Sequence, residues 1–172
     1  MQPDFTLALL SRCRKMGINT AIETCAYGDY SVIEKLLPYL DVIYADLKIM
    51  DAEQHKKYTG FSNETILANI RRIAEESSAG SFAGKLRIRI PLVPTVNMDD
   101  ANIKAAAAFC KSLAKLDFVE FLPYHRLGID SYRKLGREFL MNGIMPPGKH
   151  AVAKVKRIFE ETGPGIQIIN NK

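Results

Sequence analysis

The stretch KLRIRIPL, residues 85–92, alternates basic and apolar side chains almost to its end. A period of two is typical of a β-strand that packs one face against a core. Two further runs, DVIYADL at 41–47 and FVEFL at 118–122, have the length and the branched or aromatic content of buried strands. Shorter apolar runs at 18–24 and 165–170 complete a set of five predicted strands.

Patterns with helical spacing separate these strands. They cover residues 3–16, about 32–37, 51–58, about 64–76, 101–116 and 149–161. Strands that alternate with helices favour right-handed βαβ units, so we expect an α/β fold with a parallel sheet and flanking helices. No segment resembles an interdomain linker, and we therefore expect residues 1–172 to form a single domain. Residues 124–147 show little periodicity and predict a long loop with at most one helical turn.

Composition narrows the classes of function. The chain has 24 Lys and Arg against 19 Asp and Glu, so its formal net charge is +5. This excess is spread along the chain without a dense basic run, which argues against a nucleic-acid partner. No apolar stretch reaches the ~18 residues of a membrane span, so we expect no membrane association. The first residues lack the pattern of a secretion signal, and three scattered cysteines favour the reducing cytoplasm.

Titratable side chains follow the predicted strands. In parallel α/β folds, functional groups gather at the carboxyl ends of the strands. The side chains in question are Glu23, Asp46, Lys48, Arg89 and His125. The two carboxylates can accept hydrogen bonds from an ammonium group or from ribose hydroxyls, whereas the cations and the imidazole can bind a carboxylate or lie against an aromatic base. Together they fit a zwitterionic ligand that carries sugar hydroxyls.

Each of these side chains also has a purely structural interpretation. Glu23 is placed to pair with a cation on a neighbouring strand. Asp46 and Lys48 share a strand face and can form a simple ion pair. Arg87 and Arg89 alternate in the same way, and we expect at least one of them to be solvated.

The remaining histidines and cysteines carry no chemical signature. His55 and His150 lie in polar helical contexts and are expected at the surface. Cys25 has no histidine partner nearby and is expected to be a small buried residue, while Cys13 and Cys110 occupy apolar helical faces and are expected in the core. The three cysteines form no zinc or iron–sulfur motif, so no metal ligand and no catalytic residue is assigned.

The motifs at the strand ends also occur in an ordered series. They are MQPDF at 1–5, IETC at 22–25, DLK at 46–48, HKKYTG at 55–60 with SN at 62–63, RIPLVP at 89–94 and LPYHRLG at 122–128. In this order they resemble the glycyl-radical enzyme activating enzymes of the radical S-adenosylmethionine superfamily, which include pyruvate formate-lyase activating enzyme. The resemblance covers residues 1 to about 128, and a tail with Pro146 and Pro147 is similar to the usual ending of the family.

The resemblance implies a partial (β/α)6 barrel, of which this chain would be the C-terminal portion without the first strands. In the family, a 4Fe-4S cluster, reduced by a flavodoxin or ferredoxin type donor, cleaves S-adenosylmethionine. The resulting 5′-deoxyadenosyl radical abstracts hydrogen from a glycine of a partner enzyme in anaerobic metabolism. The cofactor-binding positions carry over to Glu23, where the family more often has Asp, and to Asp46, Lys48, Arg89 and His125.

The chain departs from the family pattern in two places. It has neither the C-x-x-x-C-x-x-C run that holds the cluster nor the Gly-Gly-Glu-Pro segment. We therefore expect this chain alone to bind no cluster or cofactor and to be inactive. The strand at 18–24 would be left with an exposed edge, which predicts self-association.

Two alternatives remain at this point. One is a self-contained (β/α) lyase or aldolase that uses Lys48 to form a Schiff base. The other is a non-catalytic module whose basic surface binds an acidic partner.

Overall fold

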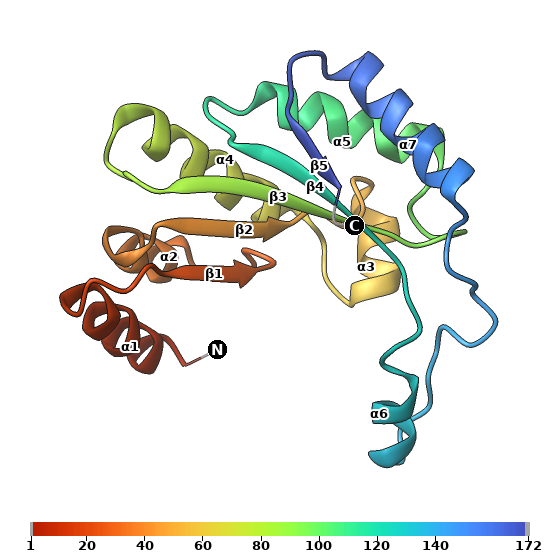
Figure 1. The fold of residues 1–172 in the computed structure, drawn as a ribbon, viewed down its shortest axis with the longest axis horizontal. Coiled ribbons are helices and arrows are strands. Elements are labelled where there is room, and N and C mark those ends of the chain that lie inside the picture. The colour runs from red at the N-terminus through yellow and green to blue at the C-terminus, as the bar shows by residue number, and fades with distance from the viewer. Residues whose placement is uncertain (1, 171–172) are drawn as a thin grey trace.

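A five-stranded parallel sheet organises the molecule. The computed structural model describes residues 2–170, and the strand order within them is β1-β2-β3-β4-β5 (Figure 1). The strands are β1 (Ala21–Thr24), β2 (Val42–Asp46), β3 (Lys85–Leu92), β4 (Phe118–Pro123) and β5 (Ile168–Asn170). Strands that are neighbours in sequence are also neighbours in space, as the predicted βαβ units require. The sheet is open, and the fold is α/β rather than a closed barrel.

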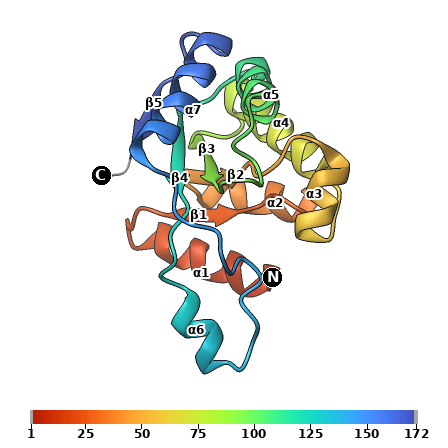
Figure 2. The ribbon, with the colours of Figure 1, turned by 90° about the vertical axis from the view of Figure 1, so that its right-hand side faces the viewer.

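Helices follow the strands along the chain, and several of them cover one face of this sheet (Figure 2). They are α1 (Pro3–Lys15), α2 (Tyr30–Leu36), the 3-10 turn η1 (Leu37–Tyr39), α3 (Ala52–Thr59), α4 (Glu64–Ala79), α5 (Asp100–Ser112), α6 (Ile129–Lys134) and α7 (Lys149–Thr162). Figure 2 shows α2, α4 and α5 on the same side of the sheet, whereas α6 lies at the end of an arm that extends away from it. None of the helices in residues 2–170 is both long and apolar enough to cross a lipid bilayer.

The core lies between the sheet and the helices. Alternate residues of the central strands are 0–1% exposed: Ile43, Ala45, Leu86, Ile88, Ile90, Val119 and Phe121. Full burial of such an apolar side chain stabilises a fold by roughly 1.5–3 kcal/mol. The register pairs Asp46 with Arg89 and Arg89 with Glu120, so the alternate positions carry polar groups on the opposite face of the sheet.

The ends of several elements differ from the sequence expectation. The first strand begins at Ala21 rather than at Ile18, because the Asp41 carboxylate accepts from the backbone N–H of Thr20 and turns the chain before the ladder starts. The N-cap of α2 is Asp29, which accepts from the N–H of Ser31 at 2.9 Å. Asn63 precedes α4 but does not cap it through its side chain.

The segment between β4 and α7, residues 124–148, is the arm. The sequence predicted a loop here, and the structure adds the six-residue helix α6. Large apolar side chains of the arm are exposed, among them Leu127 and Leu140.

Candidate functional site

The polar face of the sheet is built around Arg89. Its Nε donates to Glu120 Oε2 at 2.6 Å, its Nη1 pairs with Glu23, and its guanidinium carbon lies 3.9 Å from the centre of the Tyr44 ring. Partial burial acts to lower the pKa of Arg89, but the hydrogen bonds to Glu120 and Glu23 outweigh it and hold that pKa above its usual value. Arg89 is thus a fixed cation between one buried and one exposed carboxylate.

Arg87, two residues earlier on β3, is held in a similar way. Its Nε donates to Asp117 at 2.8 Å and its Nη1 to the Tyr44 hydroxyl at 2.7 Å. The expectation that Arg87 or Arg89 is solvated was therefore wrong, since both side chains are mostly buried. The strand alternation places both guanidinium groups on the same face, between acceptors from β1, β2, β4 and the residue before β4.

Asp46 and Lys48 form a second pair at the carboxyl end of β2. Lys48 Nζ lies 2.7 Å from Asp46 Oδ2, and each side chain is about one-third exposed, at 34% and 33%. Both line a pocket of about 300 Å³ whose other walls are mainly apolar. Its remaining lining residues are Cys25, Tyr27, His55, Thr59, Phe61 and Ile66.

Two residues in this pocket contradict the sequence expectation. His55 is only 4% exposed, and its Nδ1 lies 2.7 Å from the carbonyl oxygen of Phe61. The left-handed residue Gly60 (φ 88°) ends α3 and turns the chain back over the histidine ring, which the helical pattern does not reveal. Cys25 is exposed rather than buried, because it directly follows β1 where the chain leaves the sheet.

His125 lies two residues beyond β4, at the same edge of the sheet as Lys48. The backbone N–H of Tyr124 still donates to Leu92, so the chain leaves the sheet at His125 itself. The His125 ring is exposed and makes no hydrogen bond or ion pair to any residue between 2 and 170. The structure therefore joins Glu23 to Arg89 and Asp46 to Lys48, whereas His125 makes no contact with either pair.

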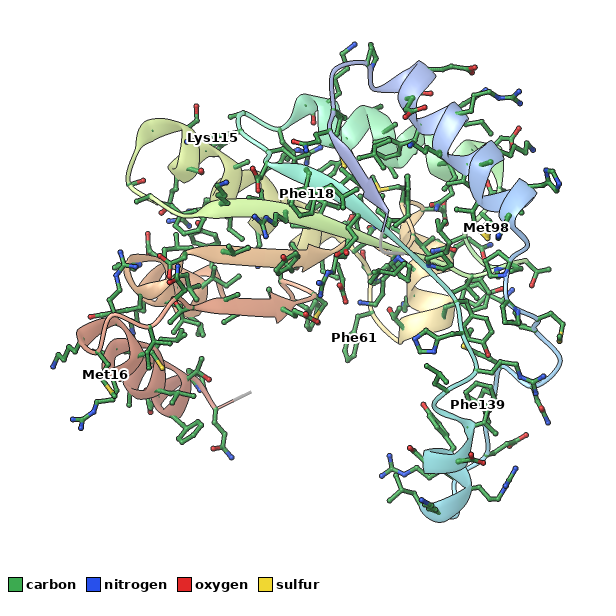
Figure 3. The ribbon with its side chains drawn as sticks, viewed as in Figure 1. Met16, Phe61, Met98, Lys115, Phe118 and Phe139 are labelled. Atoms are coloured by element: carbon green, nitrogen blue, oxygen red, sulfur yellow. The ribbon has the colours of Figure 1, made fainter. Side chains whose placement is uncertain are left out.

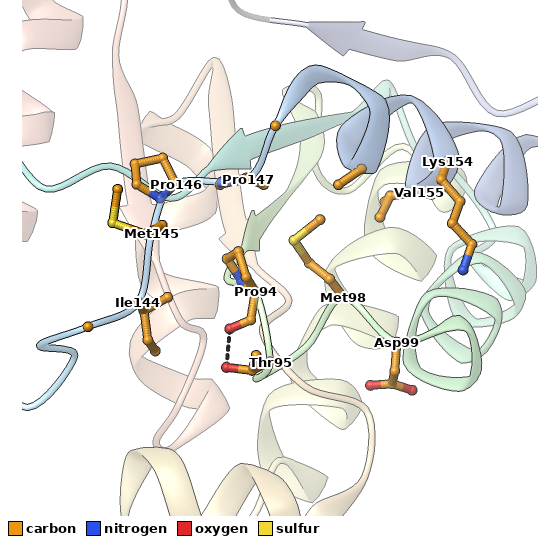
Figure 4. A pocket seen from close by; sticks show the side chains of 13 residues that line it. Pro94, Thr95, Met98, Asp99, Ile144, Met145, Pro146, Pro147, Lys154 and Val155 are labelled. Carbon is orange, nitrogen blue, oxygen red and sulfur yellow. Dashed lines mark hydrogen bonds between the residues drawn. The ribbon is translucent and has the colours of Figure 1, made fainter.

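The loop after β3 forms larger grooves that the sequence did not predict. One, of about 730 Å³, lies between Pro94–Asp99, residues 143–148 of the arm and the start of α7 (Figure 4). A second, of about 630 Å³, lies between α3 and the start of α5 and shares Thr95 and Asp99 with the first. Figure 3 shows Met98 near the first groove, Phe118 over the sheet and Phe61 beyond the carboxyl end of β1.

The cysteines lie in three separate parts of the fold. Cys13 is on α1 and half-buried, Cys25 follows β1, and Cys110 is buried on α5. Within the part of the chain that the structure describes, no group of three or more potential metal ligands comes together. The residues present therefore do not fit an iron–sulfur cluster.

Comparison with known proteins shows which proteins this chain resembles. No protein-family model matches the chain. It is 33% identical to the trans-4-hydroxy-L-proline dehydratase activating enzyme of Clostridioides difficile, over 91% of the chain and 50% of that protein. It is 38% identical to the isethionate sulfite-lyase activating enzyme of Nitratidesulfovibrio vulgaris, over 83% of the chain and 45% of that protein. The chain thus spans about half the length of the curated relatives it matches.

Solved structures of the same kind of enzyme have a similar fold. A domain of a pyruvate-formate lyase-activating enzyme from Bacteroides vulgatus matches 99% of the chain and 91% of its own length, with a TM-score of 0.78 and 28% identity. SuiB from Streptococcus suis, solved with bound S-adenosylmethionine, shares the fold alone, at a TM-score of 0.68 and 16% identity over 96% of this chain and 36% of that protein. The chain thus shares the fold of radical S-adenosylmethionine enzymes, one of which is a methyltransferase from Sphaerobacter thermophilus. Its sequence relatives are the glycyl-radical enzyme activating enzymes, of which the chain is a homologue.

Proposed function

We propose that this chain is the C-terminal portion of a radical S-adenosylmethionine activating enzyme, which generates a glycyl radical on a partner such as pyruvate formate-lyase. The observation that carries the proposal is the convergence of charged groups at the carboxyl edge of a sheet whose homologues are activating enzymes. Residues 1–172 would form one domain that contributes this edge of the sheet to the whole enzyme.

The donor set fits the polar parts of S-adenosylmethionine. In the proposed complex, the Lys48 ammonium binds the methionyl carboxylate, while Glu23 and Asp46 accept from the amino group and the ribose hydroxyls. Arg89 holds Glu23 in place through their ion pair, and the exposed His125 ring is free to lie against the adenine. Glu23 is one methylene longer than the aspartate common in the family, which shifts its contact outward.

The side chains described above would bind the cofactor but would not carry out the radical reaction. In the whole enzyme, a 4Fe-4S cluster held outside this chain would supply the electron and S-adenosylmethionine the radical chemistry, while Glu23, Asp46 and Lys48 would hold the polar groups of the cofactor. Because the three cysteines do not fit that cluster, this chain alone would be inactive. Its own contribution is to bind and orient the cofactor next to the partner's glycine loop. A flavodoxin or ferredoxin would deliver the electron to the whole enzyme, in the reducing cytoplasm that three free thiols favour.

Calorimetric titration of the chain with S-adenosylmethionine tests the proposal. The sequence led us to expect that this chain alone binds no cofactor. Because the structure forms the pocket beside Asp46 and Lys48 within this chain, the proposal now calls for weak but measurable binding. We expect a loss of about tenfold or more in Lys48→Ala, since a charge-assisted contact contributes roughly 1.5–3 kcal/mol. Lys149→Ala is the matched control, because that lysine lies at the start of α7 away from the pocket. Equal binding by both variants contradicts the proposed site. Borohydride trapping of Lys48 by a carbonyl compound would instead support the lyase alternative.

The edge strand β1 supports an accompanying proposal of self-association. Among residues 2–170, β1 pairs only with β2, so its outer backbone groups are open to another strand. Exposed Phe5 and Leu9 of α1 lie in the element that precedes it. Sedimentation equilibrium should show dimers at micromolar concentration, and a monomer at all concentrations would refute the proposal.

A further inference from the structure

The loop after β2, residues 48–50, is held by side-chain amides instead of by the sheet. Leu47 still donates its N–H to Arg89 at 2.8 Å, as the parallel ladder requires. In a parallel ladder, the next hydrogen bond would run from the backbone N–H of residue 91 on β3 to a carbonyl oxygen of β2. Residue 91 is a proline, which has no backbone N–H, so this bond is missing. The ladder between β2 and β3 therefore ends at the position where Lys48 projects from the chain.

Asn97 occupies this break. Its Nδ2 donates to the carbonyl oxygens of both Lys48 and Pro91, at 2.8 and 2.6 Å. Its Oδ1 accepts from the N–H of Val93 at 2.8 Å. One carboxamide thus connects the two strands, and the residue is only 2% exposed.

Two further asparagines complete the attachment of this loop. Asn102, in the first turn of α5, accepts from the N–H of Met50 at 2.8 Å and donates to the carbonyl oxygen of Asn97. Asn63 donates to the carbonyl oxygens of Ile49 and Met50, at 2.9 and 2.7 Å. We call Asn63, Asn97 and Asn102 the amide frame.

A strained turn brings Asn97 into this position. Thr95 has φ 64°, a left-handed conformation that is unfavourable for a β-branched residue. The turn it makes directs the chain back, so that the Asn97 side chain reaches between β2 and β3 while Thr95 itself stays exposed in the grooves of Figure 4. Such a conformation persists only where surrounding contacts fix it, and the three hydrogen bonds of the Asn97 side chain do so.

We propose that Asn97 is a positioning residue for Lys48. Acting with Asn102 and Asn63, it fixes the backbone at residues 48–50 so that the Lys48 ammonium stays beside Asp46 at the mouth of the pocket. A buried amide whose Nδ2 and Oδ1 both make hydrogen bonds gives a rigid attachment. A fixed backbone at residue 48 limits the positions that the long, flexible lysine side chain can reach, and its ion pair with Asp46 selects among them. The consequence for ligand binding rests on the function proposed above, but the effect on Lys48 does not.

The decisive variant is Asn97→Asp, which has the same shape but loses both donors and directs a carboxylate at two carbonyl oxygens. In the unliganded chain we expect the Met50 amide to exchange hydrogen about tenfold faster, as expected for an opening of the loop. Reductive methylation of Lys48, followed by mass spectrometry, should also accelerate. Asn97→Ser removes the same contacts without adding a charge and should act in the same direction if the aspartate variant fails to fold.

Two controls separate positioning from general stability. Thr20→Val removes a buried side-chain hydrogen bond to Tyr39, at the opposite end of the sheet, and should leave Met50 exchange and Lys48 methylation at wild-type rates. Asn102→Asp keeps the oxygen that accepts from Met50 and should change the exchange rate less than Asn97→Asp does. Wild-type rates in folded Asn97→Asp, or equal changes in Asn97→Asp and Thr20→Val, would overturn the proposal.

A titration with S-adenosylhomocysteine then links the frame to binding. We expect Asn97→Asp to bind at least about tenfold more weakly than wild type, while Thr20→Val binds normally. If the wild-type chain binds no S-adenosylhomocysteine, the proposed function fails, and the exchange and methylation rates still decide the role of Asn97.

Discussion

The two faces of the sheet are made by alternate residues of the same strands, yet they differ in almost every physical respect. The face toward the helices consists of fully buried aliphatic and aromatic side chains such as Ile88 and Phe121. The other face carries the Glu23–Arg89–Glu120 series and the Arg87–Asp117 pair. The buried face supplies the hydrophobic stabilisation, so the polar face can hold charged groups at fixed positions without being needed to stabilise the fold.

The difference is sharpest for the thiols. Burial raises the pKa of the Cys110 thiol to about 12, so very little of the reactive thiolate is present near neutral pH. Cys25, at the open edge, is exposed. We expect iodoacetamide at pH 8 to label Cys25 quickly and Cys110 only under denaturing conditions, with peptide mass spectrometry as the measurement. Rapid labelling of Cys110 in the native chain would show that the helix-covered side is open.

Shortening a side chain on the buried face should cost the most stability. Ile88 is fully buried on β3, and Ile88→Ala should lower the free energy of unfolding by about 3–4 kcal/mol through lost burial and a cavity. Urea denaturation measures this loss. Val42→Ala, on the other face and only half-buried, is the matched control and should lose less than half as much. Similar losses at both positions would mean that the two faces are equally packed.

The two carboxylates that pair with Arg89 should contribute unequally to the free energy of unfolding. The Glu120 side chain is 6% exposed, and Glu120→Gln should lower the free energy of unfolding by about 2 kcal/mol because Arg89 loses its buried counter-charge. The Glu23 side chain is 68% exposed, and Glu23→Gln should cost at most about 1 kcal/mol, the usual range of a surface pair. Chemical denaturation of both variants gives the comparison, and a larger loss for Glu23→Gln would reverse the assignment of the buried partner.

A smaller effect is expected at the amino end of the sheet. The Thr20 backbone N–H and the Arg14 guanidinium hold the pKa of Asp41 below its usual value. A carboxyl group whose pKa is depressed in the folded state stabilises the fold above its unfolded pKa of about 3.9, and this contribution disappears as the pH falls through the folded pKa. Asp41→Asn should therefore show a shallower loss of stability below about pH 4 in acid titrations. If the variant loses stability with falling pH as steeply as the wild type does, Asp41 contributes little to the pH dependence of folding.

Much of the fold follows from periodicity alone. The alternation in residues 85–92 predicted β3 to the residue, and the apolar runs at 41–47 and 118–122 gave β2 and β4 within one residue. These strands lie in the centre of the sheet, where burial on one face leaves a strong pattern. The ends of α2 and β1 were less accurate, because Asp29 and Asp41 act through single side-chain hydrogen bonds that have no periodic signature.

The candidate site was predictable only in part. Glu23, Asp46, Lys48 and Arg89 were selected because parallel strands end on one side of the sheet, and the structure brings them into two ion pairs; their role in binding stays a prediction, as does that of His125. The Asp46–Lys48 ion pair and a cation partner for Glu23 were also anticipated. The pairing of Arg89 with Glu120 was not, because Glu120 lies within an apolar run and gave no separate signal. The burial of His55 was missed because it depends on the turn at Gly60, which brings the Phe61 carbonyl oxygen back to the ring. The amide frame was missed because Asn97 binds Lys48, 49 residues away in the chain, and depends on the turn at Thr95.

The consecutive strand order has a consequence for how such a protein can be altered. Among residues 2–170, each strand pairs only with the strands before and after it in sequence, and no described segment crosses the outer edge of β1. A further strand–helix unit could be fused there without changing the register of β2 to β5. Whole strand–helix units can therefore be added beside β1, and such fusions should leave the structure of the five-stranded sheet unchanged.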